Sequence, residues 1–152
     1  MGGTLVCGVG KAEDRSAAEL AGALRTRLGL RLVLVHVVDD VPPGTEESLA
    51  ARQRQAGAER ILNEIARDFG DGTETRVMIG NRADALARVA AEEGADLIVI
   101  GSKRAGFGTG KLRCTLAREL EIATLIPIVL APPATRTRSD HRLAVATGAA
   151  TG

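Results

Sequence analysis

A glycine-rich segment in the second half of the chain carries four basic residues: Lys103, Arg104, Lys111 and Arg113. It follows the apolar run Leu97–Ile100 and precedes a helical pattern. A strand, a glycine-rich loop and a helix in this order can hold an anion with backbone N–H groups and a helix N-terminus. The basic side chains would then clamp a phosphate or carboxylate. A solvated surface loop is the alternative, but positive charge at a helix N-terminus is unfavourable without an anion, which favours the anion site.

Two common nucleotide-binding motifs are incomplete in this sequence. Gly8-Val9-Gly10 is followed by Glu13 at the third glycine position of the dinucleotide fingerprint. Gly110-Lys111 is followed by Leu112, where a P-loop carries the hydroxyl that binds magnesium. The dinucleotide fingerprint is therefore incomplete, and a classical P-loop is ruled out. Glycine after the first and fourth apolar runs still permits close approach of the backbone to a ligand.

The remaining reactive side chains do not form a catalytic or metal-binding set. His36 lies within an apolar run and is interpreted as a structural histidine with a satisfied hydrogen bond. Cys114 has no base near it in the sequence, so we expect no nucleophilic role for it. Cys7 and Cys114 lie in different predicted elements, and we expect both to stay reduced inside a cell. No carboxylate pair, Ser/His/Asp set or His/Cys cluster has the spacing for catalysis or metal binding, so we expect neither.

Composition narrows the function classes further. The 152 residues carry a formal net charge of +1, which gives no reason to expect nucleic acid or an anionic membrane as a partner. With two Phe and no Tyr or Trp, the chain lacks platforms for base stacking. Its apolar runs are far too short to span a membrane. The first residues show no leader pattern, so we expect a cytoplasmic protein.

The elements that would position these residues alternate along the chain. Five apolar runs predict buried strands, at Leu5–Val9, Leu32–Val38, Thr75–Ile79, Leu97–Ile100 and Ile126–Ala131. Helical patterns lie between them: one ending at Gly29 with a capping box of Ser16 and Glu19, one from Leu49 to Phe69, one from Asn81 to Gly94, and one from Lys111 to Ile122 with Ile122 facing inward. This alternation predicts a Rossmann-like α/β fold, a doubly wound parallel sheet with helices on both faces. We expect one domain over residues 1–132 and a disordered tail over 133–152.

At this level of detail the sequence resembles the universal stress protein family. Four segments carry the resemblance: LVCGVG, LVLVHVVDD, VMIGNRADALARVAAEEGADLIVIGSK and TLIPIVLAPP. Together they cover about residues 4 to 132, and their order, lengths and joints agree with the family. The resemblance implies a five-stranded sheet of order 3-2-1-4-5. It also implies a homodimer formed through the last strand, Ile126–Ala131.

The ATP-binding members of this family carry Gly-x2-Gly-x9-Gly-[Ser/Thr] after the fourth strand. Gly101 matches the first glycine and Thr115 keeps the hydroxyl, but Arg104 and Cys114 replace the other two glycines. The first strand usually ends in an Asp, and this chain has Gly10 there. The resemblance thus implies a nucleotide pocket that is degraded at these three positions. Its candidate residues are Val9, Val37, Ile100, Gly101, Ser102 and Thr115.

Two functions follow as hypotheses from this resemblance. The first is a non-catalytic, dimeric stress-response module for binding or signalling, with a degraded or altered nucleotide site and no required cofactor. The alternative is an ATP-binding member that acts as a nucleotide-dependent switch with slow or no hydrolysis. The changes at Gly10, Arg104 and Cys114 favour the first, whereas Gly101, Thr115 and the basic loop favour the second. We expect no metal site and no enzyme, with a weak ATPase activity left open.

Overall fold

The computed structural model describes residues 2–10, 15–38, 46–104, 112–113 and 115–133. Lys111, Cys114 and the predicted tail beyond residue 133 lie outside the described residues.

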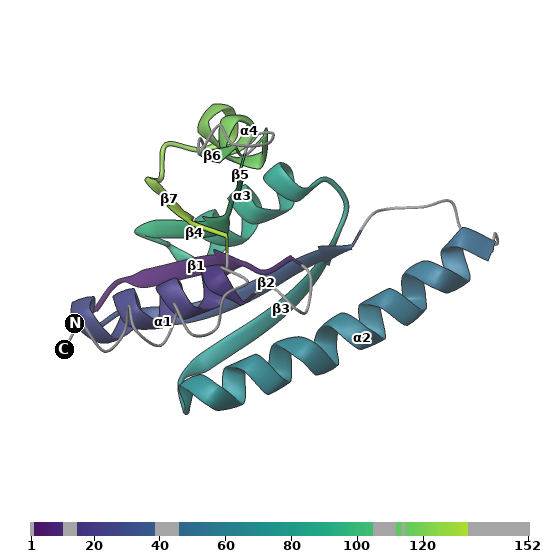
Figure 1. The fold of residues 1–152 in the computed structure, drawn as a ribbon, viewed down its shortest axis with the longest axis horizontal. Coiled ribbons are helices and arrows are strands. Elements are labelled where there is room, and N and C mark those ends of the chain that lie inside the picture. The colour runs from purple at the N-terminus through teal and green to yellow at the C-terminus, as the bar shows by residue number, and fades with distance from the viewer. Residues whose placement is uncertain (1, 11–14, 39–45, 105–111, 114, 134–152) are drawn as a thin grey trace.

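Five strands form one parallel sheet in the order β3-β2-β1-β4-β7, which confirms the predicted topology (Figure 1). Strands β1 and β4 are neighbours, so the strand order reverses between them. The central strands are rich in Leu, Val and Ile, as expected for a parallel sheet that is covered on both faces. The strands are β1 (Thr4–Gly8), β2 (Arg31–Val38), β3 (Thr73–Ile79), β4 (Leu97–Gly101) and β7 (Ile128–Ala131).

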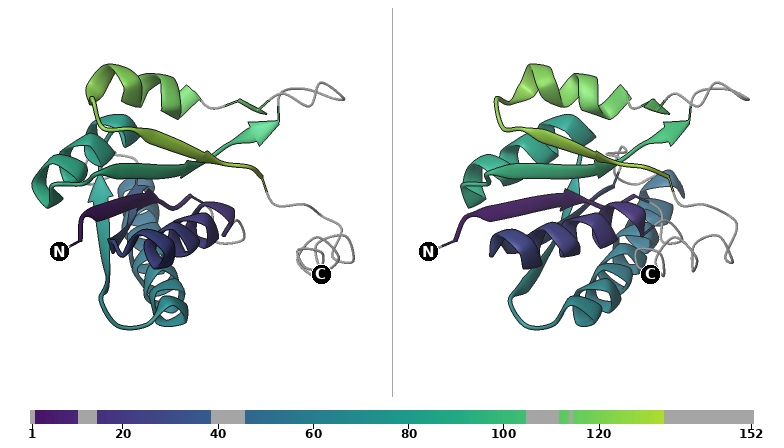
Figure 2. Two further views of the ribbon diagram at one scale, coloured as in Figure 1. Left: turned by 90° about the vertical axis from the view of Figure 1, so that its left-hand side faces the viewer. Right: turned by 60° about the vertical axis from the view of Figure 1, so that its left-hand side comes forward.

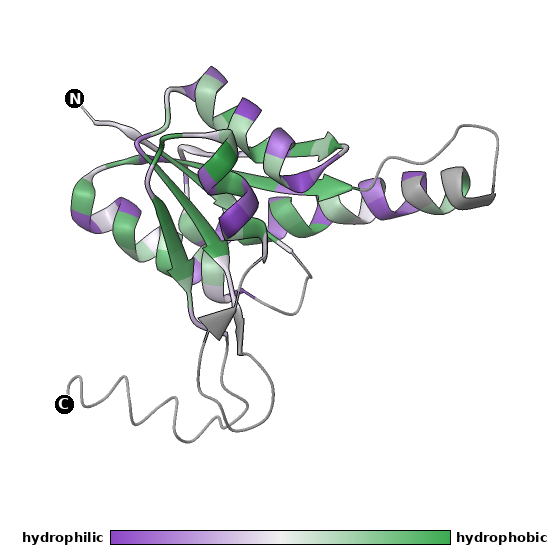
Figure 3. Ribbon diagram, turned by 90° about the horizontal axis from the view of Figure 1, so that it is seen from above, coloured by the Kyte–Doolittle hydropathy of each residue, from purple (hydrophilic) through white to green (hydrophobic). Residues whose placement is uncertain are grey.

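In the described part of the chain, four helices cover the two faces of the sheet (Figure 2). Helices α1 (Ser16–Leu28) and α2 (Glu46–Phe69) pack on one face, while α3 (Arg82–Glu93) and α4 (Thr115–Ala123) pack on the other. Hydrophilic residues gather on the outer sides of the helices, and the strands between them are hydrophobic (Figure 3). The sheet therefore separates two apolar cores, one on each face.

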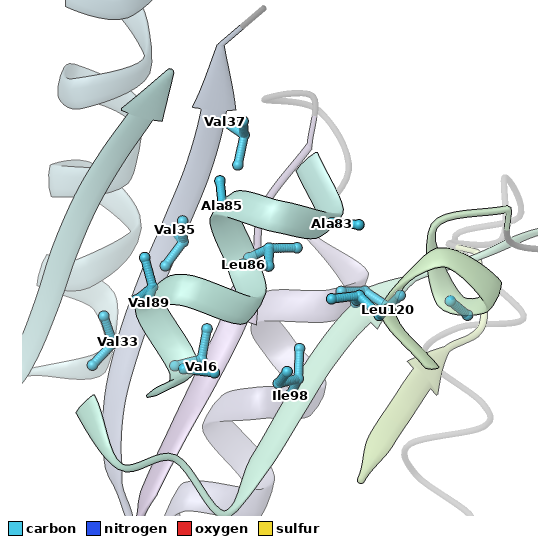
Figure 4. Close-up of a cluster of buried hydrophobic side chains, with 13 residues drawn as sticks. Val6, Val33, Val35, Val37, Ala83, Ala85, Leu86, Val89, Ile98 and Leu120 are labelled. Atoms are coloured by element: carbon cyan, nitrogen blue, oxygen red, sulfur yellow. The ribbon is translucent and has the colours of Figure 1, made fainter. Parts of the chain in front are cut away.

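Alternation along each strand divides its residues between these two cores. In β1, Val6 faces the core under α3 and α4, whereas Leu5 and Cys7 face the core under α1 and α2. Leu86 of α3 and Leu120 of α4 meet the first core and are almost fully buried, as Figure 4 shows. Burial of each large aliphatic side chain stabilises the fold by about 1.5–3 kcal/mol.

Helices α1 and α2 approach each other closely at Gly22. A Cβ atom at that position would lie 2.4 Å from Cε1 of Phe69, so glycine is what allows the ring to pack there. One turn further on, Arg25 donates to the carbonyl groups of Phe69 at 3.0 Å and Asp71 at 2.8 Å, and to Thr73 Oγ1 at 2.7 Å. Arg25 thereby bonds the Phe69 carbonyl, which the end of α2 leaves without a partner in the helix, and a carbonyl of the turn that follows.

A network of charged residues covers the outer edge of the sheet. Arg31 of β2 pairs with Glu74 of β3 and with Glu93 of α3. Arg76 of β3 lies 2.9 Å from Glu92 and 3.3 Å from Glu93. The hydrogen bond from Arg31, aided by Arg76, holds the pKa of the Glu93 carboxyl below its usual range against the opposing effect of desolvation.

The fourth helix differs from the prediction at both ends. It begins at Thr115, because Leu112–Arg113 forms a short strand, β6, that pairs antiparallel with β5 (Lys103–Arg104). The predicted inward position of Ile122 is wrong, since its side chain is 89% exposed. Leu120 marks the buried face of α4, and two further residues turn the helix by about 200°, which points Ile122 outward.

The predicted capping box at the start of α1 is also wrong. Ser16 is the first helical residue, and the residue at the N-cap is Arg15, whose side chain makes no capping hydrogen bond. The N–H of Glu19 donates to the Arg15 carbonyl at 2.8 Å, which is the ordinary backbone bond of a first helical turn. The Ser-x-x-Glu spacing is therefore present, but its serine lies at the first helical position and not at the N-cap.

Candidate functional site

The carboxyl edge of the sheet has a step above the end of β1. The β1–β2 ladder ends with Gly8 opposite Val35, but β2 continues to Val38, paired with β3. Likewise β4 continues past its last β1 partner, Val99, to Gly101, paired with β7. We call this step the β1 notch. It lies where the strand order reverses, which is the usual ligand position in a doubly wound sheet.

The floor of the β1 notch is tied to β2 through Val9. The Val9 N–H donates to the carbonyl of Val35 at 2.7 Å. The Val9 carbonyl lies 2.8 Å from Nδ1 of His36. Because a carbonyl can only accept, this bond requires the hydrogen on Nδ1. The expected hydrogen bond of His36 is thus present, with a partner that the sequence did not identify.

Gly10 and Gly101 lie at the ends of β1 and β4, at the notch. A Cβ atom built on either one would have no heavy atom of the described residues within 4 Å, so packing against that part of the chain does not demand glycine at these positions. Neither has a positive φ, so backbone conformation does not demand it either. Gly10 is exposed and Gly101 is half-buried. Among the described residues, nothing therefore occupies the space that a side chain at either glycine would take.

The apolar candidates of the predicted pocket are buried. Val9 is 6% exposed, Val37 is 8% exposed and Ile100 is 1% exposed. Val37 and Ile100 face the core under α3, whereas Val9 faces the core under α1. Their side chains thus shape the edge from below, and a ligand at the notch would meet mainly their backbone groups.

Ser102 is buried and its polar groups are already bonded. Its N–H donates to the Ala131 carbonyl at 3.1 Å, and its hydroxyl donates to the same oxygen at 2.8 Å. The hydroxyl hydrogen is therefore committed to β7. Ser102 anchors the chain where it leaves β4, and it is better suited to position a ligand loop than to donate to a ligand itself.

The segment after Ser102 leaves the sheet as a ribbon. The backbone of β5 pairs with that of β6, with Lys103 opposite Arg113 and Arg104 opposite Leu112. Thr115 begins α4 directly after this segment and is exposed. The first turn of α4 carries no acidic residue, so nothing in that turn offsets the positive end of the helix dipole.

The structure thus brings the predicted residues of the first, second and fourth strands to one edge. Arg104 and Thr115 follow on the chain segment that leaves this edge, and Cys114 lies outside the described residues. Sequence reasoning missed the β5–β6 ribbon and the bond between His36 and Val9. The ribbon had one available signal, since glycines at positions 106, 108 and 110 separate the paired segments, as in a hairpin connection.

The free cysteine of the described chain, Cys7, is buried. Burial raises the pKa of the Cys7 thiol to about 12, so at neutral pH it is not a thiolate nucleophile. Among the described residues, no group of His, Cys, Asp and Glu could hold a metal ion. In that part of the chain, no helix is long and apolar enough to cross a membrane.

Comparison with known sequences identifies one family. The sequence model of the universal stress protein family matches residues 1–118. No curated protein matches the chain.

Solved structures share the fold over nearly their full length. A universal stress protein from Archaeoglobus fulgidus is 26% identical with a TM-score of 0.58, covering 86% of this chain and 99% of that chain. A universal stress family protein from Burkholderia pseudomallei is 26% identical with a TM-score of 0.62, covering 84% of this chain and 95% of that chain. The universal stress protein from Archaeoglobus fulgidus in complex with dAMP is 20% identical with a TM-score of 0.58, covering 84% of this chain and 96% of that chain. At that identity, the likeness to the dAMP complex concerns the fold alone.

Proposed function

Since this chain belongs to the universal stress protein family, we propose that it is a non-catalytic stress-response binding module with an altered nucleotide site. The observation that carries the proposal is the β1 notch, where the exposed backbone of Gly10 replaces the carboxylate of ATP-binding members. A ribose or base contact is lost with that carboxylate, at about 1–2 kcal/mol.

The segment after β4 supports the same conclusion. The resemblance assigns phosphate binding to the backbone of this segment, but Arg104 stands at a glycine position and its backbone is paired with Leu112. The Ser102 hydroxyl donates to Ala131 and is not free to donate to a phosphate. These changes together weaken nucleotide binding by several orders of magnitude relative to a complete site.

A second candidate, the nucleotide-dependent switch, is favoured by what the notch keeps. Gly101 leaves open space at the end of β4, and Thr115 is exposed at the start of α4. A related fold has been solved with dAMP bound. In this candidate the basic residues of the segment would replace the missing glycine amides as phosphate partners.

Calorimetric titration of the purified protein with ATP and magnesium separates the two candidates. Mass analysis of any nucleotide that co-purifies accompanies it. The binding module predicts no measurable heat and no retained nucleotide. Binding in the micromolar range or tighter would make the switch the better account.

We also propose that the protein forms a homodimer through β7. The carbonyl of Pro127 accepts from Ile98 of β4, and that of Ala131 accepts from Ser102, which directly follows β4. Strand alternation therefore directs the backbone groups of Ile128 and Leu130 to the free edge. Unpaired edges of this kind pair readily with another strand. The opposite edge strand, β3, carries charged residues within an ion-pair network, whereas β7 carries none.

Two exposed apolar residues beside β7 extend this interface. Ile122 is 89% exposed and Leu125 is 101% exposed, although both are large hydrophobic side chains. Sedimentation equilibrium on Ile122→Glu with Leu125→Glu should show a dissociation constant raised at least about tenfold, since two apolar contacts are worth a few kcal/mol. Leu28→Glu, at another exposed apolar site, is the control and should leave the dimer unchanged. A parent protein that stays monomeric at high concentration would contradict the dimer.

A further inference from the structure

The position of His36 in β2 departs from the pattern of its own strand. Leu32 and Leu34 are fully buried in the core under α1 and α2. With a period of two residues, the next position on that face is 36. A leucine there would continue the apolar pattern, but the chain places a half-buried imidazole at this point.

The bond that His36 makes replaces a bond of the sheet. In a continued parallel ladder, the Val9 N–H donates to the Val35 carbonyl, and the Val9 carbonyl then accepts from the N–H of Val37. The first of these bonds is present at 2.7 Å. In the described part of the chain, the partner of the Val9 carbonyl is Nδ1 of His36, at 2.8 Å. Accordingly, the β1–β2 ladder ends at Gly8 while β2 continues beside β3.

We propose that His36 keeps the carboxyl edge of the sheet open: its imidazole holds the Val9 carbonyl and so prevents the β1–β2 ladder from continuing through Val37. The Val37 N–H is then directed to the β1 notch, where it can donate to an acceptor atom of a bound ligand. His36 is in this view a positioning residue that acts through Val9 and Val37. The ligand-binding part of this inference rests on the second candidate function, in which a nucleotide binds at the β1 notch, whereas the ladder part rests on neither candidate.

The burial of the two flanking residues makes this device effective. Val9 and Val37 point their side chains into opposite cores, so neither strand end can turn away from the sheet at small cost. Gly10 follows Val9 directly and has open space around it. The donor to the Val9 carbonyl therefore decides the course of β1. With the Val37 N–H as donor, β1 stays paired with β2, and with the His36 imidazole as donor, the pairing ends.

Hydrogen exchange of single backbone amides in the ligand-free protein tests the inference. In the parent protein, the Val37 amide should exchange at least about 100-fold faster than the Val35 amide, which lies within the paired ladder. This comparison needs no variant. Equal protection of the two amides would overturn the proposal.

Two substitutions provide the second arm. In His36→Leu the Val9 carbonyl loses the imidazole, and the ladder should close over it, slowing Val37 exchange at least about tenfold. In His36→Asn the amide nitrogen lies near the position of Nδ1 and can still donate, so Val37 should exchange as in the parent. A merely structural role for His36 predicts the opposite sign, with faster exchange in His36→Leu. Unchanged or faster exchange at Val37 in a folded His36→Leu would therefore refute the inference.

Failure of the ladder inference and failure of the proposed function would be seen in different experiments. Exchange in the absence of ligand reports on the ladder alone, and nucleotide titration reports on binding. If ATP binds, a saturating concentration should slow hydrogen exchange at the Val37 amide in the parent protein and in His36→Asn. The affinity of His36→Leu for ATP should be at least about tenfold weaker than that of the parent. Equal ATP affinity in all three proteins would remove Val37 from the ligand contacts.

Discussion

At the scale of single residues, the candidate site depends on its glycines as much as on its larger side chains. Gly10 is exposed, has no positive φ, and has no described neighbour where a side chain would begin. It therefore lacks a packing reason to be glycine, in contrast to Gly8, where a Cβ would lie 3.1 Å from Leu86. The sequence predicted that Gly10 matters, but only the structure distinguishes an open position from a packed one.

Gly10→Asp should tighten nucleotide binding about tenfold, because a carboxylate at the notch adds one charge-assisted hydrogen bond worth about 1–2 kcal/mol. It should leave the free energy of unfolding within about 0.5 kcal/mol, as for other open surface sites. Calorimetric titration and urea unfolding measure the two effects. Gly10→Asn, which lacks the charge, should gain less, and an equal gain in both variants would argue against a role for the carboxylate.

At the scale of elements, the apolar runs predicted the strands and most of the helices, because burial on both faces leaves a clear pattern in sequence. The α4 boundary and the β5–β6 ribbon could not be predicted in this way. Leu112 fits a helical spacing with Leu116 equally well, and the choice was made by backbone pairing with Arg104. The bond between His36 and Val9 is likewise a long-range contact that no local pattern encodes.

Two glycines within helices provide a matched pair of predictions about packing. Gly57→Ala in α2 places the added Cβ more than 4 Å from every heavy atom of the described residues outside its own helix, so it should stabilise the protein by about 0.5–1 kcal/mol through helix propensity. Gly22→Ala in α1 would bring Cβ within 2.4 Å of the Phe69 ring, and overpacking costs about 1–3 kcal/mol. Thermal or urea unfolding should therefore show a higher free energy of unfolding for Gly57→Ala and a lower one for Gly22→Ala, each relative to the parent protein. Stabilisation by both substitutions would mean that the contact between α1 and α2 is looser than described.

The ion-pair network at β2, β3 and α3 predicts a pH-dependent contribution to stability. The pKa of Glu93 is lowered in the folded protein, so its contribution is complete at neutral pH and is lost as the pH falls below about 4.3, the ordinary glutamate value. The difference in unfolding free energy between the parent and Glu93→Gln should thus narrow as the pH is lowered from 7 to 3. Glu92→Gln, at a more exposed carboxylate with one of these arginine contacts, should show a smaller difference. If the difference in unfolding free energy between the parent and Glu93→Gln grew as the pH was lowered, the assigned pairing of Glu93 with Arg31 and Arg76 would be contradicted.

At the scale of the whole molecule, fold and family could be predicted from the sequence, and the state of the site could not. Alternating elements fix a doubly wound sheet, and four matched segments indicate the family. The state of the candidate site depends on individual hydrogen bonds at one edge of the sheet. Examples are the commitment of the Ser102 hydroxyl to Ala131 and the end of the β1–β2 ladder at Gly8. Such features arise from packing between distant segments, so they appear only in the structure.

The most direct test compares ATP and magnesium titrations of the parent protein and of the triple variant Gly10→Asp, Arg104→Gly, Cys114→Gly. An altered nucleotide site predicts that the parent gives no measurable heat and that the triple variant gains at least about a hundredfold in affinity, because three weakened contacts are restored together. A triple variant that binds no better than the parent, or a parent that already binds at micromolar concentration, would contradict the account.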